Sequence, residues 1–142
     1  MPVVDASMVV DWVAPGSHPE LPAVKALARL ADEQADLFAP RLLMEEVSNA
    51  LLTGIRRKRW SGAAADRAHV LLRDLPIKLD DEPGDLDRAW GLSRRYDNHP
   101  IYDLLYVALA ERHHAQLITA DSALRERLVG LDWIIAPETL LR

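Results

Sequence analysis

Val3-Val4-Asp5-Ala6-Ser7 stands near the start of the chain, and Leu117-Ile118-Thr119-Ala120-Asp121 has a similar pattern near the other end. Each segment has the short apolar run of a buried strand, followed closely by an aspartate. An aspartate at that place also favours the start of a helix, because its carboxylate caps free backbone N–H groups. The two segments therefore predict short strands that lead directly into helices.

The same alternation of short apolar runs and longer amphipathic runs fills the chain between them, with no repeat or linker. We expect strands at Met1–Val4, Leu37–Ala39, Pro76–Leu79, Gln116–Thr119 and Trp133–Ala136. We expect helices at Ala6–Val13, Pro19–Gln34, Pro40–Arg57, Ser61–Leu72, Pro83–Arg95, Pro100–His114 and Ser122–Leu128, and a terminal helical turn at Pro137–Leu141. Alternating strands and helices predict an α/β layer fold with a mainly parallel sheet.

The composition excludes several classes of protein. A length of 142 residues suits a single domain over residues 1–142. The absence of cysteine excludes a disulfide scaffold, a thiol nucleophile and a cysteine metal site. No apolar run approaches the roughly 20 residues of a membrane span, and the N-terminus lacks the basic region of a signal peptide. We therefore expect a soluble cytoplasmic protein. The glycines form no phosphate-binding fingerprint, so a nucleotide cofactor is not expected.

The charge balance is acidic. The chain has 22 acidic and 17 basic residues, which gives a formal net charge of −5. Taken alone, this balance argues against a protein that holds nucleic acid by bulk positive charge.

Two aspartates are expected at one edge of the sheet. In α/β folds ligands bind outside the carboxyl ends of the strands, and Asp5 and Asp121 follow two of the expected strands. For either aspartate alone, helix capping and a functional role are equally good interpretations. The presence of both at the same edge favours function.

A glutamate is expected near the same core. At about 100° per residue, the helix Pro40–Arg57 places Glu46 beside its apolar stripe, whereas Glu45 faces solvent. Asn49 follows Glu46 by three residues, on the same edge, and we expect it to hold the Glu46 carboxylate. The alternative is a boundary glutamate with no function.

The fourth acid stands in the most apolar helix. Pro100–His114 is apolar nearly all round, which predicts a buried helix. Asp103 lies in its first turn, where the helix dipole alone would favour an acid. A buried carboxylate needs a partner because an unpaired buried charge is costly, and only Arg95 and Arg112 flank the helix. We expect a metal ion to be that partner.

Four segments in register carry a family resemblance. They are Val3-Val4-Asp5-Ala6-Ser7, Glu46-Val47-Ser48-Asn49-Ala50-Leu51, Tyr102-Asp103-Leu104-Leu105-Tyr106-Val107-Ala108-Leu109-Ala110 and Thr119-Ala120-Asp121. Their order and spacing resemble the PIN domain, and specifically the VapC-type toxin ribonucleases of bacterial toxin–antitoxin pairs. The family's four acids fall on Asp5, Glu46, Asp103 and Asp121, and its polar supporting positions on Ser7, Asn49 and Thr119. The insertion Asp97-Asn98-His99-Pro100 departs from the family's usual hydrophobic lead-in.

The resemblance implies a three-layer PIN-like fold and a Mg²⁺-dependent endoribonuclease, with Mn²⁺ able to substitute. It also implies an RNA substrate, a cognate VapB-like antitoxin that blocks the site, and a homodimer. All-oxygen ligation suits these hard cations, and the ion would offset a repulsion of about 4 kcal/mol between two carboxylates about 4 Å apart. Asp5 and Asp103 are expected as direct ligands, with Glu46 and Asp121 completing the sphere or orienting water.

Basic residues near the acids are interpreted in two ways. Arg56, Arg57, Lys58 and Arg59 form the one dense basic run and follow the helix of Glu46. They either stabilise the end of that helix or contact RNA phosphates beside the acid site. Arg94 is a second RNA-binding candidate. The histidines show no partner spacing, so none is expected in the site.

Two other functions compete with the ribonuclease. A catalytically inactive PIN-like module that binds RNA or protein would be expected to have lost some of the four acids. A phospho-acceptor receiver domain would need a lysine after a late strand, and Lys25, Lys58 and Lys78 do not stand there.

Overall fold

The computed structural model describes residues 1–142 and contains one five-stranded sheet in which every neighbouring pair is parallel. The strand order is β3-β2-β1-β4-β5, with β1 in the centre. The strands are β1 (Val3–Val4), β2 (Leu37–Ala39), β3 (Ile77–Leu79), β4 (Leu117–Ile118) and β5 (Ile134–Ile135). The predicted α/β fold with a parallel sheet is confirmed.

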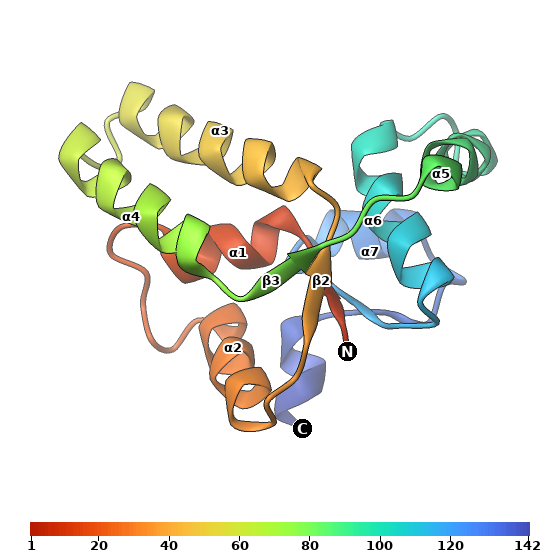
Figure 1. Ribbon diagram of the computed structural model, residues 1–142, viewed down its shortest axis with the longest axis horizontal. Helices are drawn as coiled ribbons and strands as arrows, with labels where there is room; N and C mark the ends of the chain where they lie inside the picture. Colours follow the sequence, from red (N-terminus) through yellow and green to blue (C-terminus); the bar gives the residue numbers. More distant parts are fainter.

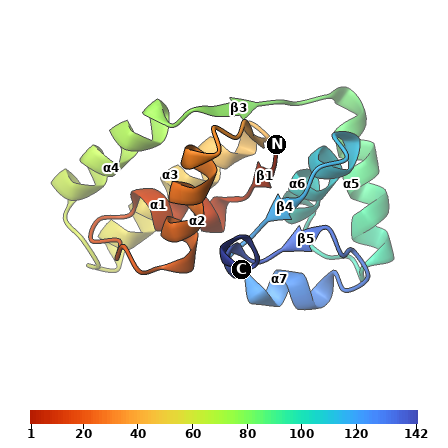
Figure 2. The same cartoon turned by 90° about the horizontal axis from the view of Figure 1, so that it is seen from below.

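Helices cover both sides of the sheet in three layers. Helices α1 to α4 lie on one side and α5 to α7 on the other (Figures 1 and 2). The helices are α1 (Ala6–Val13), α2 (Pro22–Asp32), α3 (Leu42–Arg56), α4 (Gly62–Asp74), α5 (Pro83–Arg95), α6 (Ile101–Arg112) and α7 (Ser122–Arg127), with a short 3₁₀ helix, η1 (Pro137–Leu141), at the end. None of them is long and apolar enough to cross a membrane.

Two of the expected helices begin two or three residues later than predicted, and each difference involves a proline. The second helix begins at Pro22, not Pro19, because Pro22 suits the first helical turn. The long third helix begins at Leu42, two residues after Pro40. Ser61 caps α4 as predicted, and its Oγ accepts a hydrogen bond from the Ala64 N–H at 3.1 Å.

The central strands align the candidate site residues. Val3 pairs with Leu117 and Val4 with Ile118, and all four side chains are fully buried. This register places Asp5 and Thr119 next to each other, one residue beyond their strands, at the carboxyl edge of the sheet. Helix α6 packs on β1 and β4 from the side of α5 and α7.

Helices α3 and α4 form a hairpin that extends away from the sheet (Figure 1). It has a small core of its own, made of Leu51, Ala65 and Ala68, with Ile55 and Trp60 against them. The Trp60 indole N–H donates to the Leu51 carbonyl at 3.0 Å. Gly54 permits this contact, because a Cβ there would lie 2.0 Å from the indole ring.

Candidate active site

Asp5 is the most buried acid of the site. It follows β1 at once, is 7% exposed, and caps α1 by accepting the Met8 N–H at 3.2 Å. The Ser7 hydroxyl donates to the same carboxylate oxygen at 2.6 Å. Burial raises the pKa of Asp5 to about 6, although the Ser7 and Thr119 hydroxyls and the Met8 N–H favour the charged form. Capping and a place in the site are therefore compatible roles for this residue.

Hydroxyl groups connect the ends of β1 and β4. The Ser7 Oγ lies 3.3 Å from the Thr119 Oγ1 and accepts the Ala120 N–H at 3.0 Å. Thr119 is fully buried, and its Oγ1 accepts the Asp121 N–H at 3.0 Å. Asp121 itself is exposed and caps α7 through the Leu124 N–H. The predicted supporting positions Ser7 and Thr119 thus hold the two aspartate-bearing turns together.

Glu46 reaches the same place from α3. The Tyr106 hydroxyl of α6 donates to the Glu46 Oε1 at 2.6 Å, across the layers of the fold. Burial, followed by the charge of Asp103, raises the pKa of Glu46, and only the Tyr106 bond opposes them. The prediction that Asn49 holds this carboxylate is wrong, because Asn49 is exposed and Tyr106 is the partner. Tyr106 follows Asp103 by three residues and lies on the same helix face, but no pattern in the sequence links it to Glu46, which is 60 positions away.

Asp103 has a histidine partner that was not expected from the sequence. The His99 Nε2 lies 2.7 Å from the Asp103 Oδ2. The expectation that no histidine belongs to the site is therefore wrong, whereas the metal ion expected as a partner of Asp103 stays a prediction. The four-residue spacing of His99 and Asp103 in the sequence is the signal that could have found this partner, although Pro100 stands between the two residues. The Asp103 side chain is also 37% exposed and less buried than its helix suggested.

Three acids therefore share one neighbourhood without a lysine or arginine. The charge of Asp103 raises the pKa of both Asp5 and Glu46, and no basic side chain lowers either. Asp121 joins them only through the hydroxyls of Ser7 and Thr119. No three of the histidine, aspartate and glutamate side chains are gathered closely enough to form a ready-made metal cluster. The arrangement is an acidic edge of the sheet in which neither Asp5 nor Glu46 has a basic partner.

The basic residues predicted to bind RNA lie away from the acids, whereas Arg125 of α7 donates to the Thr119 carbonyl. The exposed side chains of Arg56, Arg57 and Lys58 stand at the tip of the α3–α4 hairpin. At about 1.5 Å rise per residue, Arg56 is about 15 Å from Glu46 along the helix. The expectation that this run borders the acid site is wrong, because a straight helix separates the two. Arg94 bonds the Asn98 Oδ1 at 2.8 Å and supports the loop before α6.

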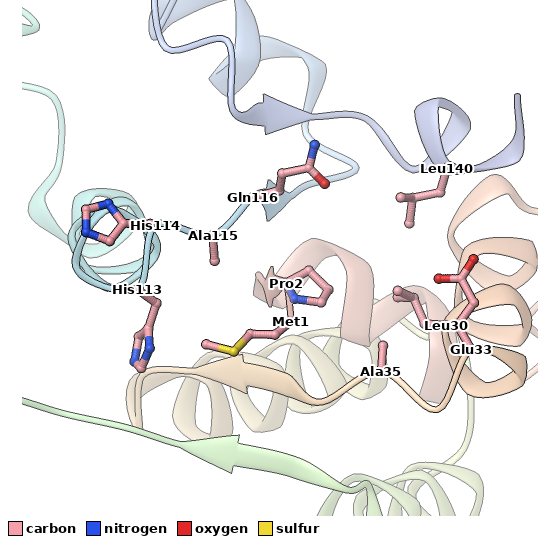
Figure 3. A pocket seen from close by; sticks show the side chains of 10 residues that line it. All are labelled: Met1, Pro2, Leu30, Glu33, Ala35, His113, His114, Ala115, Gln116 and Leu140. Atoms are coloured by element: carbon pink, nitrogen blue, oxygen red, sulfur yellow. The ribbon is translucent and has the colours of Figure 1, made fainter.

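A cavity of about 480 Å³ lies at the opposite edge of the sheet. Figure 3 shows that Met1 and Pro2, which precede β1, line it together with Ala35 and Gln116. These residues stand at the amino ends of the strands, and none of the four candidate acids lines the cavity. Because α/β folds bind ligands at the carboxyl ends, this cavity is not the site of the acids.

Comparison with known proteins agrees with this geometry. A model of the PIN domain matches residues 3–127. The chain belongs to the PIN domain family. Ribonuclease VapC1 of Mycobacterium tuberculosis is a relative, 32% identical over 126 residues that cover 86% of each protein. The resemblance to VapC-type ribonucleases that the four segments indicate is thereby confirmed.

Solved structures share the PIN fold. The crystal structure of PAE2754 from Pyrobaculum aerophilum matches 99% of this chain and 91% of its own, with a TM-score of 0.71 and 26% identity. A toxin–antitoxin complex from Klebsiella pneumoniae matches 96% and 98%, with a TM-score of 0.66 and 17% identity. Mycobacterium tuberculosis VapC20, a toxin that cleaves the sarcin–ricin loop, matches 94% and 98%, with a TM-score of 0.64 and 15% identity. The last two likenesses concern the fold.

Proposed function

We propose that this PIN domain protein is a Mg²⁺-dependent endoribonuclease, with Mn²⁺ able to substitute, and acts as the toxin of a VapBC-type pair. One observation carries the proposal. Asp5 is buried, negatively charged at neutral pH and grouped with Glu46 and Asp103, with no lysine or arginine to offset the charge. The similarity of the chain to Ribonuclease VapC1 supports RNA as the substrate.

The donor chemistry fits Mg²⁺. The four acids Asp5, Glu46, Asp103 and Asp121 offer oxygen ligands only, which is what this ion prefers. Mg²⁺ keeps several waters and binds through one or two carboxylates, so it does not require three preassembled acids. Asp5 and Asp103 are the proposed direct ligands, and Glu46 and Asp121 act through water. When bound, the ion would supply the Lewis-acid chemistry that polarises a phosphodiester and activates water.

The chain's own residues prepare the reaction in three ways. The Ser7 hydroxyl and the start of α1 fix the orientation of the Asp5 carboxylate. The Tyr106 hydroxyl fixes one oxygen of Glu46 and leaves the other free. Because its pKa is raised, Glu46 is a better proton acceptor than an ordinary glutamate, and we assign it the proton of the attacking water.

A metal-dependent cleavage assay tests the proposal. The purified protein is incubated with total RNA and Mg²⁺, and the new RNA ends are mapped. Cleavage that stops with a chelator and returns with added Mg²⁺ or Mn²⁺ supports the mechanism. Cleavage that persists in the chelator contradicts it.

The alternative, a catalytically inactive PIN-like module that binds RNA or protein, is tested by calorimetry. A titration with Mn²⁺ separates the two, since an inactive module has no reason to bind the ion at these acids. Saturable binding that is abolished in Asp103→Asn supports the enzyme. The absence of heat, together with the absence of cleavage, supports the module.

We also propose a VapB-like antitoxin and a homodimer as partners. An acidic edge favours an inhibitor with basic segments, and a relative in fold was solved as a toxin–antitoxin complex. The surplus of aliphatic residues in Leu21–Leu30 and in the helix that follows Pro40 favours interfaces there, and large apolar side chains are exposed on other helices as well. Leu52 is exposed on α3, which is the expected helix, whereas Val70 and Leu71 are exposed on α4 and Leu86 and Trp90 on α5. The molar mass in solution, measured by light scattering with and without the antitoxin, tests both partners.

A further inference from the structure

The loop before α6 contributes a side chain to the acidic edge. It comprises Asp97, Asn98, His99 and Pro100, of which His99 alone is buried, at 9% exposure. The His99 Nε2 contacts the Asp103 Oδ2 at 2.7 Å. No other histidine has a hydrogen bond to one of the four acids, since the others bond different groups or none.

The backbone of the loop is built to hold His99 in that place. Asp97 and Asn98 both have left-handed conformations, with φ values of 58° and 59°, which aspartate and asparagine tolerate better than most residues. The Arg94 guanidinium bonds the Asn98 side chain at 2.8 Å, and the His99 N–H donates to the Tyr96 carbonyl at 3.2 Å. The turn is therefore fixed at both of its ends.

The contact leaves Asp103 available to a cation. A carboxylate has two oxygens and about four acceptor positions, and His99 occupies one position on Oδ2. No side chain donates to the Oδ1 of Asp103, so this oxygen can bind an ion at the acidic edge while Oδ2 is held. A hydrogen bond of this kind fixes the rotation of the carboxylate before any ligand arrives.

We propose that His99 is a positioning residue, which orients the Asp103 carboxylate for divalent-cation binding through its Nε2 contact. The inference rests on the proposed metal-dependent function and names a residue of that site. Hydrogen-bond partners of ligating carboxylates usually contribute about 10–100-fold in metal affinity or activity. A histidine that only caps the start of α6 would affect folding stability and not the affinity for the ion.

Two substitutions at His99 separate these roles. His99→Phe keeps a ring of similar size and removes the nitrogen, whereas His99→Gln offers an amide N–H that can reach Asp103. We expect His99→Phe to weaken Mn²⁺ binding in calorimetry by about 10–100-fold and to lower kcat with little change in KM. His99→Gln should recover most of the affinity. His69→Gln is the matched control, since His69 is exposed and contacts only the Ser48 hydroxyl at 3.1 Å.

Thermal melting of each variant identifies a folding defect. If His99→Phe does not fold, the ¹⁵N spectrum of the histidines of the intact protein provides the test during a Mg²⁺ titration. The His99 Nε2 signal should then shift over the same Mg²⁺ concentrations that give the binding heat. An unmoved signal, or a folded His99→Phe with the Mn²⁺ affinity of the unaltered protein, overturns the proposal. An unaltered protein that neither binds Mn²⁺ nor cleaves RNA would instead refute the proposed function.

Discussion

Two groups of carboxylates in this protein differ in their side-chain partners. At the acidic edge, Asp5 and Glu46 have hydroxyl partners but no basic ones. Around α5 and α6, every acid of a second group has a cation. Arg112 bonds Asp85 at 2.9 Å and Asp80 at 3.3 Å, His113 contacts Asp80, and Arg88 bonds Glu111 at 2.6 Å.

The pKa values of the two groups move in opposite directions. Burial raises the pKa of Asp5 and Glu46. The hydrogen bond with His113 lowers the pKa of Asp80, and that with Arg88 lowers the pKa of Glu111. The paired group ties β3 and α5 to α6 and serves the fold. The unpaired group costs stability, and such a cost is retained where a ligand compensates for it.

Removal of the Asp5 charge should give the largest effect, which is a loss of RNA cleavage. Asp5→Asn keeps the cap on α1 but removes the proposed ligand, so we expect the RNA cleavage rate to fall by at least about 100-fold, since such an ion contributes several kcal/mol. Asp85→Asn in the paired group is the control and should cleave RNA at the original rate. Initial rates on one RNA substrate measure both. Equal losses in the two variants would contradict the division into groups.

The pH dependence of stability should differ in sign between the groups. The folded protein holds a proton on Asp5 up to about pH 6, whereas an unfolded aspartate loses it near 3.8, so this residue lowers stability as the pH rises between these values. In metal-free buffer, Asp5→Asn should therefore be more stable than the original protein by up to about 3 kcal/mol at pH 7, and by little at pH 4. Urea unfolding at both values measures the difference.

In the paired group, folding stability should change with pH in the opposite direction. The pKa of Asp80 is lowered in the folded state, so its contribution is present above the ordinary aspartate pKa and is lost as the pH falls below it. Asp80→Asn should consequently be less stable than the original protein at pH 7, with the deficit shrinking in acid. If Asp80→Asn were more stable than the original protein at pH 7, the assignment of Asp80 to the paired group would be wrong.

Arg112 should be the most sensitive residue of the paired group. Its guanidinium is the common partner of Asp80 and Asp85, so Arg112→Met leaves both carboxylates without it. We expect a decrease of about 1–3 kcal/mol in the free energy of unfolding. The cleavage rate per folded molecule should not change. Thermal and urea unfolding check the loss of stability. The cleavage rate checks whether Arg112 influences the chemistry at the acidic edge.

The contrast between the groups also explains what the sequence could predict. The strands, the helices and the places of Asp5 and Glu46 follow from local periodicity and from the rule that sites lie at the carboxyl edge of the sheet. The bond between Tyr106 and Glu46 joins residues 60 positions apart, and no local pattern contains it. The same holds for Arg112, whose partners come from the end of β3 and from α5 once the sheet has formed.

His99 was missed for a different reason. Its spacing to Asp103 was visible, but proline usually ends a helical face, and the two left-handed residues before it are a property of the folded loop. The basic run follows the helix of Glu46 in the sequence but lies far from Glu46 in space, because a helix keeps its two ends apart. Sequence patterns therefore located the acids and missed the partners that orient them.

The basic residues at the tip of the α3–α4 hairpin form a third set of charges. Their substitution should have the smallest effect, which is on RNA affinity. Arg56, Arg57 and Lys58 have no acidic partner, so they resemble the unpaired acids with the opposite sign. If unpaired charges face ligands, these cations bind RNA phosphates away from the cleavage point. Arg56→Gln with Arg57→Gln should then weaken RNA binding a few-fold. The slope of log affinity against log salt should become shallower by about 0.7 for each single-strand phosphate that is no longer neutralised.

The cleavage rate of this double variant at saturating RNA should be unchanged, because Glu46 lies far along the helix from the basic run. Fluorescence anisotropy over a salt series measures the slope, with Arg73→Gln on α4 as a control that removes one charge outside the run. An unchanged slope would limit Arg56 and Arg57 to stabilising the end of α3, where cations interact favourably with the helix dipole. A shallower slope with an unchanged rate would instead separate RNA binding at the tip of the hairpin from chemistry at the acidic edge.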